Sequence, residues 1–331
     1  MSKKYDVCAI GNALVDYEIE VGDEFFQERG VEKGLMTLVD ADRQKELLEG
    51  VKGNVKKKQG GGSAANTVFG MAAFGGKGFY TCKVGNDEDG KLYVNDLIKS
   101  GIGTNLDPQN LYVGTTGKCL VMITPDAERT MNTFLGITTD FSANELDHEA
   151  IKASNYIFLE GFLVSSPTGL EAMKEAKKVA IENNVKVSLT FSDPSMVKYF
   201  RDQMIEVVGD GVDLLFCNVE EARLFTGLED LDEVKEALSK VAKQFVITFS
   251  EKGSQVYDGS TFIDIEPFPT KAVDSTGAGD MFAGAFLYGI NNGLTIKDSG
   301  RLASAASSAV VSKFGPRLED GQVQKILEKI A

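Results

Sequence analysis

The chain has 331 residues, 43% of them hydrophobic and 25% charged, which is typical of a globular protein that can build one large core. Its formal net charge of −14 at pH 7 argues against a nucleic-acid partner, and no apolar run approaches the roughly 20 residues that cross a bilayer. Four scattered cysteines without metal-ligand spacing, and an amino terminus without an apolar leader, favour a reduced, cytosolic protein.

The first predicted strand is Val7-Cys8-Ala9-Ile10, whose unbroken apolar run is typical of a strand buried on both faces. Gly11-Asn12 ends it, and Tyr17 to Val21 then alternates apolar and polar residues, as a half-exposed strand does. Asp16 lies between the two. Its carboxylate can accept hydrogen bonds from two neighbouring hydroxyl groups of a ligand, and a solvated aspartate at the start of a strand is the alternative.

A glycine cluster at residues 60–62 precedes Ser63-Ala64-Ala65-Asn66 and a helical stretch. We expect these glycines to bring the backbone close to a polyhydroxyl ligand, with a simple tight turn as the alternative. The spacing also fits a dinucleotide-binding fingerprint, with Asp87 near the required offset, but residues 55–59 are not a convincing buried strand, which that fingerprint needs. A P-loop is excluded because Gly76 stands where its lysine belongs.

A hairpin is predicted where residues 118–124 and 129–134 form strands around the turn Pro125-Asp126-Ala127-Glu128. With the strand at 17–21 it would form a small sheet over one end of the main domain, a lid. Arg129 starts the second strand of the hairpin. It could close over a substrate or a phosphate, and a surface salt bridge is the alternative.

From about residue 153 onward, predicted strands and helices alternate, which indicates βαβ units and a parallel sheet covered by helices on both faces. The predicted strands are 156–159, 186–190, 214–217 and 245–249, and the helices are 170–183 and 220–225. Ligands of such sheets bind beyond the carboxyl ends of the strands. Side chains that follow predicted strands are therefore expected to line one cleft: Asn12, Glu160, Asp193, Asn218 and Ser250.

Two polar features in this half of the chain have competing interpretations. Asn218 and Glu221 lie three residues apart where a strand passes into a helix, so they could order hydrated Mg²⁺ near phosphates or cap the helix. His148, the only histidine, follows Leu146-Asp147 at a polar helix start and is expected on the surface. Hydrolysis by a Ser-His-Asp arrangement would depend on it, so that class of enzyme is disfavoured.

The segment Asp274-Ser275-Thr276-Gly277-Ala278-Gly279-Asp280 runs directly into the apolar stretch 281–287. Glycines allow backbone N–H groups to converge on a ligand, and the start of the following helix adds unpaired donors and the positive end of its dipole. We expect an anion to bind there. Asp280, in the first helical turn, could hold a hydroxyl group beside a bound phosphate and accept its proton late in transfer.

The segments 61–66 and 274–280 resemble the two signatures of the ribokinase-like (PfkB) family of carbohydrate and nucleoside kinases, in the family's order. Asn218-Val219-Glu220-Glu221 resembles its N-x-x-E motif. The resemblance implies an α/β, three-layer fold with a mostly parallel central sheet and a small β-sheet lid. It also implies one kinase domain over residues 1–331, with a lid built from segments near 14–39 and 112–136, and the use of ATP and Mg²⁺.

The resemblance assigns roles to individual residues. Asp280 would be the catalytic base, and Gly277, Ala278 and Gly279 would form the anion hole. The implied substrate contacts are Asn12, Asp16, Gly61, Gly62, Ser63, Asn66, Arg129 and Phe162. The implied nucleotide contacts are Asn218, Glu221, Thr248, Ser250 and Gly253, with Glu221 holding Mg²⁺ through water and Asp274 a candidate ligand for a monovalent cation such as K⁺.

The substrate implied by the resemblance is a nucleoside, phosphorylated on its primary hydroxyl, because the segments 11–16 and 160–163 are more similar to adenosine kinases than to ribokinases. Apolar walls for a purine base would come from Leu14, Met36, Phe134 and Phe162. Asp193-Pro194-Ser195 departs from the more apolar pattern near the base pocket, so a free-sugar kinase of the ribokinase or fructokinase type is the alternative. A non-catalytic sugar or nucleotide sensor and a nicotinamide-dependent oxidoreductase are the competing classes, and the chain could be a monomer or a homodimer.

Overall fold

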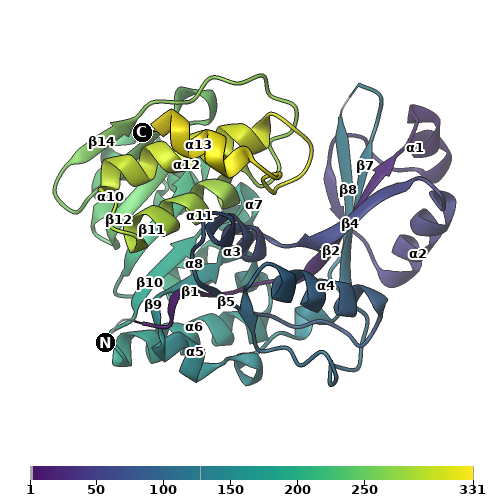
Figure 1. Cartoon of the computed structure of the whole chain (residues 1–331), viewed down its shortest axis with the longest axis horizontal. Helices are drawn as coiled ribbons and strands as arrows, with labels where there is room; N and C mark the ends of the chain where they lie inside the picture. The colour runs from purple at the N-terminus through teal and green to yellow at the C-terminus, as the bar shows by residue number, and fades with distance from the viewer. Residues whose placement is uncertain (1–2, 127, 331) are drawn as a thin grey trace.

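A computed structural model describes residues 3–126 and 128–330 and places a large layered body beside a smaller sheet (Figure 1). The large sheet has the strand order β14-β13-β12-β11-β10-β9-β1-β5-β6. Neighbouring strands are parallel except for the pairs β12–β13 and β13–β14, which confirms the predicted mostly parallel sheet. The strands are β1 (Tyr5–Ile10), β5 (Gly78–Thr81), β6 (Gly103–Thr104), β9 (Ser154–Glu160), β10 (Lys186–Thr190), β11 (Val212–Asn218), β12 (Ala242–Thr248), β13 (Ser254–Tyr257) and β14 (Phe262–Ile265).

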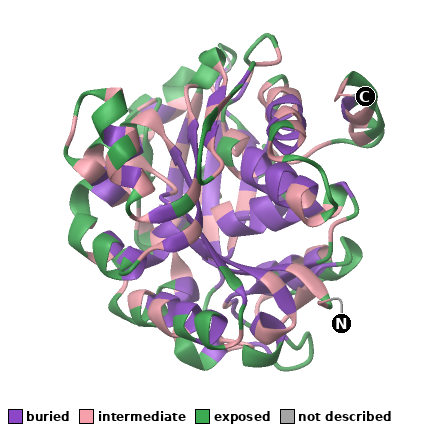
Figure 2. Cartoon of the chain, turned by 90° about the vertical axis from the view of Figure 1, so that its left-hand side faces the viewer, coloured by how far each residue is buried: buried purple, intermediate pink, exposed green. Residues whose placement is uncertain are grey.

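Helices cover both faces of this sheet, because its central strands are apolar on both sides. In β1, Val7 and Ala9 belong to one hydrophobic core and Cys8 and Ile10 to the other, so successive side chains fill opposite layers. Figure 2 shows the buried strands of the sheet between helices on either side. The first core lies under α3 (Ser63–Ala73), α11 (Ala278–Asn291) and α12 (Ile296–Val311), and α13 (Gln322–Ile330) joins it. The second lies under α5 (His148–Lys152), α6 (Pro167–Glu182), α7 (Pro194–Tyr199), α8 (Arg201–Val208), α9 (Val219–Thr226) and α10 (Leu231–Ser239).

The smaller sheet has the order β3-β8-β7-β2-β4 and projects to one side of the body (Figure 1). Its strands are β2 (Leu14–Glu20), β3 (Met36–Leu38), β4 (Val55–Gly61), β7 (Gly117–Ile123) and β8 (Arg129–Phe134). The antiparallel pairing of β7 with β8 confirms the predicted hairpin, although Ala127 of its turn lies outside the described residues. The helices α1 (Asp23–Arg29) and α2 (Ala41–Gly50) accompany this sheet, and α4 (Glu88–Lys99) contacts β4 from the side of the body.

Residues 55–59 form most of strand β4, but they are not a buried strand, as the sequence indicated. The strand forms, but its lysines at positions 56–58 are exposed and only its last three residues are buried. It lies at the edge of the smaller sheet, antiparallel to β2, and lysines on an edge strand oppose pairing with other chains. Because β4 is not part of a parallel βαβ unit, the dinucleotide-binding fingerprint still lacks its structural context.

The structure also bears on the predictions for the cysteines, for His148 and for membrane spans. All four cysteines are buried and free, and His148 is exposed at the start of α5, as predicted. Among the described helices, none combines the length and the apolar character that crossing a bilayer requires. Short 3₁₀ helices cover Gly136–Asp140, Ala143–Glu145, Gly161–Ser165 and Ser250–Lys252.

Candidate active site

Two sequence motifs that lie more than 200 residues apart meet at the side chain of Asp280. The hydroxyl of Ser63 donates a hydrogen bond of 2.6 Å to Asp280 Oδ1, and the amide of Asn66 donates one of 3.2 Å to Asp280 Oδ2. Both donors lie in the first turn of α3 and the acceptor lies in the first turn of α11, and these two helices pack together. The amino-terminal ends of two helices therefore converge on one carboxylate.

The start of α11 leaves backbone donors free. The N–H of Ala278, predicted to be part of the anion hole, instead bonds to the carbonyl of Ser275. The N–H groups of Gly279 and Asp280 have no acceptor among the described residues. Gly277 has φ of 74°, and a β-carbon there would lie 2.3 Å from Pro316 Cβ, so the turn requires glycine. Around Gly279, in contrast, no atom lies within 4 Å of where a β-carbon would be. The helix tip thus combines unpaired donors with open space, as an anion site needs.

Burial raises the pKa of Asp280 to about 6, although the hydrogen bonds from Ser63 and Asn66 favour the ionised form and limit the shift. The carboxyl group is therefore mostly ionised at pH 7, and its pKa is close enough to 7 for it to accept a proton. This combination is suited to a group that first accepts a hydrogen bond and later a proton.

The first glycine cluster is closed, unlike the tip of α11. A β-carbon at Gly61 would lie 2.2 Å from Asp16 Oδ2, and one at Gly62 would lie 2.1 Å from the carbonyl oxygen of Asn12. Gly62 also has φ of 104°. The absence of side chains lets Gly61 approach Asp16 of β2 and lets Gly62 approach Asn12, in the segment between β1 and β2.

Asp16 and Asn12 differ in how their side chains are engaged. Burial raises the pKa of the Asp16 carboxyl to about 7, while the nearby charge of Arg317 opposes the shift and that of Glu18 adds to it. The Asn12 side-chain oxygen accepts a hydrogen bond of 3.2 Å from the hydroxyl of Thr138. Asp16 keeps no hydrogen-bonding partner among the described side chains, so its oxygens are free to accept from a ligand.

Glu160 has a structural role that the sequence did not reveal. It is fully buried at the end of β9, where Oε1 accepts a hydrogen bond of 3.0 Å from the N–H of Asn12 and Oε2 one of 2.7 Å from the N–H of Ala64. Burial raises its pKa to about 7. One carboxylate thus holds the backbone at Asn12 and at Ala64, in the two segments that are predicted to contact the substrate. The available signal was a single acid inside the apolar segment 158–163, which placed Glu160 in the cleft without indicating its partners.

Arg129 and Asp274 contact each other. Arg129 was predicted to bind the substrate, and Asp274 was predicted to bind a monovalent cation. Arg129 Nη2 lies 2.9 Å from Asp274 Oδ2, and their side chains are only 10% and 3% exposed. The Arg129 guanidinium also lies over the ring of Phe314 at 5.2 Å. The ion pair considered as an alternative therefore forms, but it is buried and joins β8 to the loop before α11.

The surroundings of Asp274 do not suit a further cation while Arg129 is in this position. Asp274 Oδ1 accepts a hydrogen bond of 3.0 Å from the N–H of Thr276, and Oδ2 accepts one of 3.0 Å from the N–H of Gly315. These two donors and the adjacent charge of Arg129 already engage the carboxylate. These contacts do not support the predicted monovalent cation at Asp274.

Asn218 and Glu221 form a capping box at the start of α9. The N–H of Glu221 donates to Asn218 Oδ1 at 2.8 Å, and the N–H of Asn218 donates to Glu221 Oε2 at 3.0 Å. Burial raises the pKa of Glu221 to about 7, and the charge of Asp193 adds to the shift. Glu221 Oε1 also accepts a hydrogen bond of 2.8 Å from the Asn218 amide, so both carboxylate oxygens are engaged and any contact with a magnesium ion would be through water. No cluster of three metal-binding side chains occurs in the described part of the chain.

The predicted nucleotide segment follows β12, next to the end of β11. Thr248 pairs with Asn218 in the parallel register, so the two strand ends lie side by side. Ser250 has φ of 54°, and the N–H of Phe249 bonds to the carbonyl of Gly253 at 2.8 Å, which closes a tight loop. These contacts place the candidate residues along the carboxyl edge of the sheet, where ligands of such folds bind.

The apolar residues expected around a base are solvent-accessible. Met36 is 45% exposed, and its neighbours Leu35 and Leu38 are 49% and 60% exposed. Leu14, Phe134 and Phe162 are each half-buried. Phe162 lies in the 3₁₀ turn directly after Glu160.

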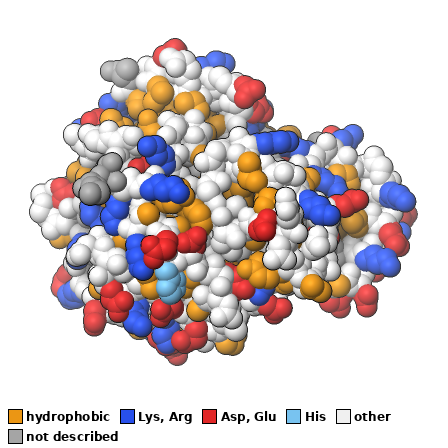
Figure 3. Space-filling view, turned by 60° about the horizontal axis from the view of Figure 1, so that its bottom comes forward, with side chains coloured by type: hydrophobic (Ala, Val, Ile, Leu, Met, Phe, Trp, Pro, Cys, Tyr) orange, Lys and Arg blue, Asp and Glu red, His pale blue; other side chains and the backbone are white. Residues whose placement is uncertain are grey.

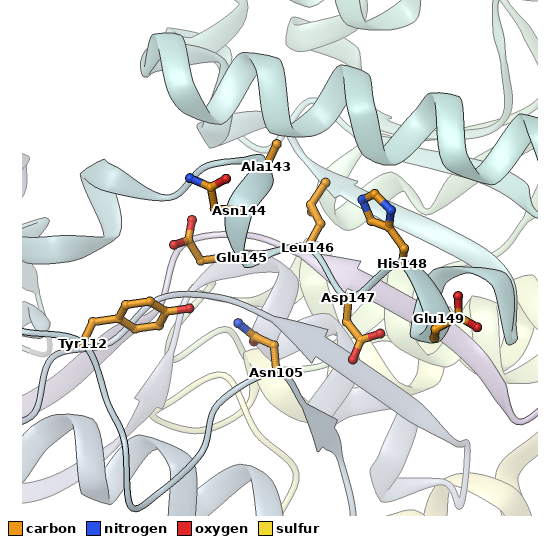
Figure 4. Close-up of a pocket in the computed structure, with 9 residues that line it drawn as sticks. All are labelled: Asn105, Tyr112, Ala143, Asn144, Glu145, Leu146, Asp147, His148 and Glu149. Atoms are coloured by element: carbon orange, nitrogen blue, oxygen red, sulfur yellow. The ribbon is translucent and has the colours of Figure 1, made fainter.

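A separate cavity of about 520 Å³ lies away from these residues and contains none of the predicted site residues. Figure 3 shows that face of the molecule, with the single histidine among acidic side chains. Its lining comes from a loop near Asn105 and Tyr112 and from residues 143–149, which Figure 4 shows spread along one side of the hollow.

Comparison with known proteins is consistent with this geometry. A family model described as pfkB family carbohydrate kinase matches residues 34–320. Adenosine kinase of Saccharomyces cerevisiae is 27% identical over 93% of this chain and 95% of its own length, and 5-dehydro-2-deoxygluconokinase of Clostridium beijerinckii is 30% identical over 77% and 79%. The crystal structure of adenosine kinase from Sinorhizobium meliloti superposes with a TM-score of 0.88 at 32% identity, covering 98% of this chain and 99% of that one.

Proposed function

The chain belongs to the pfkB family of carbohydrate kinases, whose members among its relatives act as sugar or nucleoside kinases, and from that premise we propose that it phosphorylates the primary hydroxyl of a nucleoside. The protein is an ATP-dependent kinase of this family, and the proposal concerns its acceptor and its working residues. The single observation that carries it is the position of Asp280, which lies in the first turn of α11 beside unpaired N–H groups.

The pKa of Asp280 limits what it can do as a base. A hydroxyl of pKa near 16 exceeds a carboxyl of pKa about 6 by roughly 10 units, which corresponds to about 14 kcal/mol. Abstraction of the proton before transfer is therefore excluded energetically. Asp280 instead orients the hydroxyl and takes its proton only as the new bond to phosphorus forms, when the hydroxyl becomes acidic.

Other residues of the site orient and stabilise. The N–H groups at Gly279 and Asp280 stabilise negative charge on the transferred phosphoryl group, and Glu221 would hold Mg²⁺ through water. When bound, Mg²⁺ supplies charge neutralisation at the phosphates. Ser63 and Asn66 fix the Asp280 carboxylate, and Asp16 accepts hydrogen bonds from the sugar hydroxyls.

The choice of a nucleoside is supported by the exposed apolar side chains of the smaller sheet. Leu35, Met36 and Leu38 each expose more than 40% of their surface, and a free sugar offers them no apolar partner. A purine base does, and ligand pockets for such molecules are lined mainly by apolar side chains. A free-sugar acceptor is the second candidate, favoured by the relative from Clostridium beijerinckii and by the polar Asp193 near the expected base position.

The role of Asp280 is tested with Asp280→Asn, which keeps the shape and the hydrogen-bond acceptor but removes the base. We expect turnover to fall by about 10² or more, with thermal unfolding and ligand binding nearly unchanged. Asp320→Asn, which alters an exposed carboxylate, is the matched control and should keep full activity. Near-normal turnover of the Asp280 variant would refute the assigned base.

The acceptor is tested by measuring ATP-dependent phosphorylation across adenosine, guanosine, inosine, ribose and fructose. We expect the highest kcat/KM with a nucleoside. Rates confined to a free sugar would reject the nucleoside but leave the kinase assignment intact. Binding without transfer under every metal and substrate condition would instead favour the sensor interpretation.

A further inference from the structure

A second cavity, of about 580 Å³, lies at the free edge of β4, between α4 and the segment that follows α12. None of the residues that contact Asp280 line it. Its polar lining consists mainly of donors: Lys57, Lys58 and Gln59 of β4, Lys99 of α4, and Lys313 and Arg317 of the following segment. Leu92 and Leu318 add apolar surface. The volume is in the range of small-molecule sites.

Positive charge in this groove exceeds what its acids can balance. Of the two acids that line it, Asp96 is already engaged, because it accepts from Arg317 Nη1 at 2.8 Å and from the N–H of Gly60 at 3.0 Å. Lys57, Lys99 and Lys313 form no ion pair with any described residue. Lys313 Nζ contacts only main-chain oxygens, those of Phe314 at 3.2 Å and of Gly315 at 3.5 Å. In a chain of net charge −14, such a local excess of cations is unusual.

Two buried donors on side chains that line the groove lack acceptors among the described residues. The side chain of Gln59 is 6% exposed, and its Nε2 has no hydrogen-bonding partner among the described residues. The Nε of Arg317 is likewise buried and unpaired. An unsatisfied buried donor costs about 1–3 kcal/mol, so its retention calls for an explanation. An acceptor with several oxygens would satisfy both donors and neutralise the lysines.

We propose that this groove binds a phosphate-bearing small molecule at a site separate from the one that receives the transferred phosphoryl group. Phosphate oxygens accept from lysine, arginine and amide donors, and a guanidinium matches their geometry. The leucines would contact the remainder of the molecule. Arg317 also donates a hydrogen bond to the carbonyl of Gly60 in β4, and its guanidinium lies over the ring of Phe69. A ligand bound to Arg317 would therefore lie next to β4.

The test uses pyrophosphate as the probe, in a protein whose helix tip cannot take an anion. Gly279→Asp provides this background, because no atom lies within 4 Å of a β-carbon at that position and the added carboxylate repels anions. Calorimetric titration without Mg²⁺ at low ionic strength should detect one site. In the same background, Lys57→Ala/Lys99→Ala should weaken binding about tenfold or more. The exposed pair Lys178→Ala/Lys240→Ala is the control for net charge and should bind pyrophosphate as the background does.

Gln59→Leu gives a second, independent measurement. It should weaken pyrophosphate binding about fivefold while leaving thermal stability without the anion unchanged or raised, because it removes an unsatisfied buried donor. The absence of binding to a folded Gly279→Asp protein would overturn the proposal. So would equal affinity in the Lys57/Lys99 variant, or an equal loss in the control pair, which would indicate only general electrostatic attraction.

Discussion

The two glycine clusters of this protein use the same residue for opposite purposes. At residues 60–62 the missing side chains are replaced by neighbouring atoms, since Asp16 and the carbonyl of Asn12 occupy the positions where β-carbons would be. At Gly279 the missing side chain leaves open space beside unpaired N–H groups. The first cluster brings protein segments together, whereas Gly279 leaves room for a ligand. Gly277, whose β-carbon would lie 2.3 Å from Pro316 Cβ, resembles the first cluster instead. Glycine content alone therefore does not identify a binding loop. What identifies one is whether the space that a β-carbon would take is empty or is filled by neighbouring atoms.

Substitution in the first cluster should have the largest effect on stability. Gly62→Ala places a β-carbon 2.1 Å from the carbonyl oxygen of Asn12, at a φ of 104° that L residues rarely adopt. We expect the free energy of unfolding to fall by about 3 kcal/mol, measured by denaturant titration. Gly53→Ala, also at positive φ but without an atom within 4 Å, isolates the backbone contribution and should cost less. Equal losses in the two variants would mean that the close approach to Asn12 is unimportant.

Substitution in the second cluster should impair catalysis without unfolding the protein. Gly279→Val fills the open space above the unpaired N–H groups, and we expect kcat/KM for ATP to fall about 100-fold. The free energy of unfolding should change by less than about 1 kcal/mol, because the position is helical and uncrowded. If stability fell as it does in Gly62→Ala while activity persisted, the contrast between the clusters would be wrong.

The pH dependence of activity sharpens the comparison. Burial raises the pKa of Asp280 to about 6, so its ionised form is lost as pH falls through that value. We expect kcat/KM to be level above about pH 7 and to fall tenfold per pH unit well below 6. Thermal unfolding at each pH checks that the fold persists. A break near 7 would instead assign control to Asp16, Glu160 or Glu221, whose pKa values burial raises to about 7.

Much of this arrangement could be predicted from the chain. The apolar runs of β1 and β9 indicated buried parallel strands, and the 274–280 segment indicated a helix start with free donors beside Asp280. These features depend on short-range pattern and local backbone chemistry. The alternation from residue 153 onward was equally readable, because each strand and helix there has its own hydrophobic period.

Other features depend on partners far away in the sequence. Lysines obscured β4, because an edge strand needs no apolar face, and its register comes from β2. The contacts of Glu160 join segments about 100 and 150 residues away, and the pair formed by Arg129 and Asp274 spans a similar distance. No local pattern encodes such contacts. The capping box at Asn218 was one of two interpretations that composition could not separate.

Only Gly62 separates β4 from α3, so the smaller sheet is connected directly to the residues that hold Asp280. We infer that any rotation of the smaller sheet is transmitted through this single residue to Ser63 and Asn66, which links enclosure of the acceptor to alignment of the base in one mechanical motion. Crystal structures with and without an acceptor would check this: the Ser63–Asp280 separation should change together with the tilt of the smaller sheet. An unaltered separation across a clear tilt would show that the two move independently.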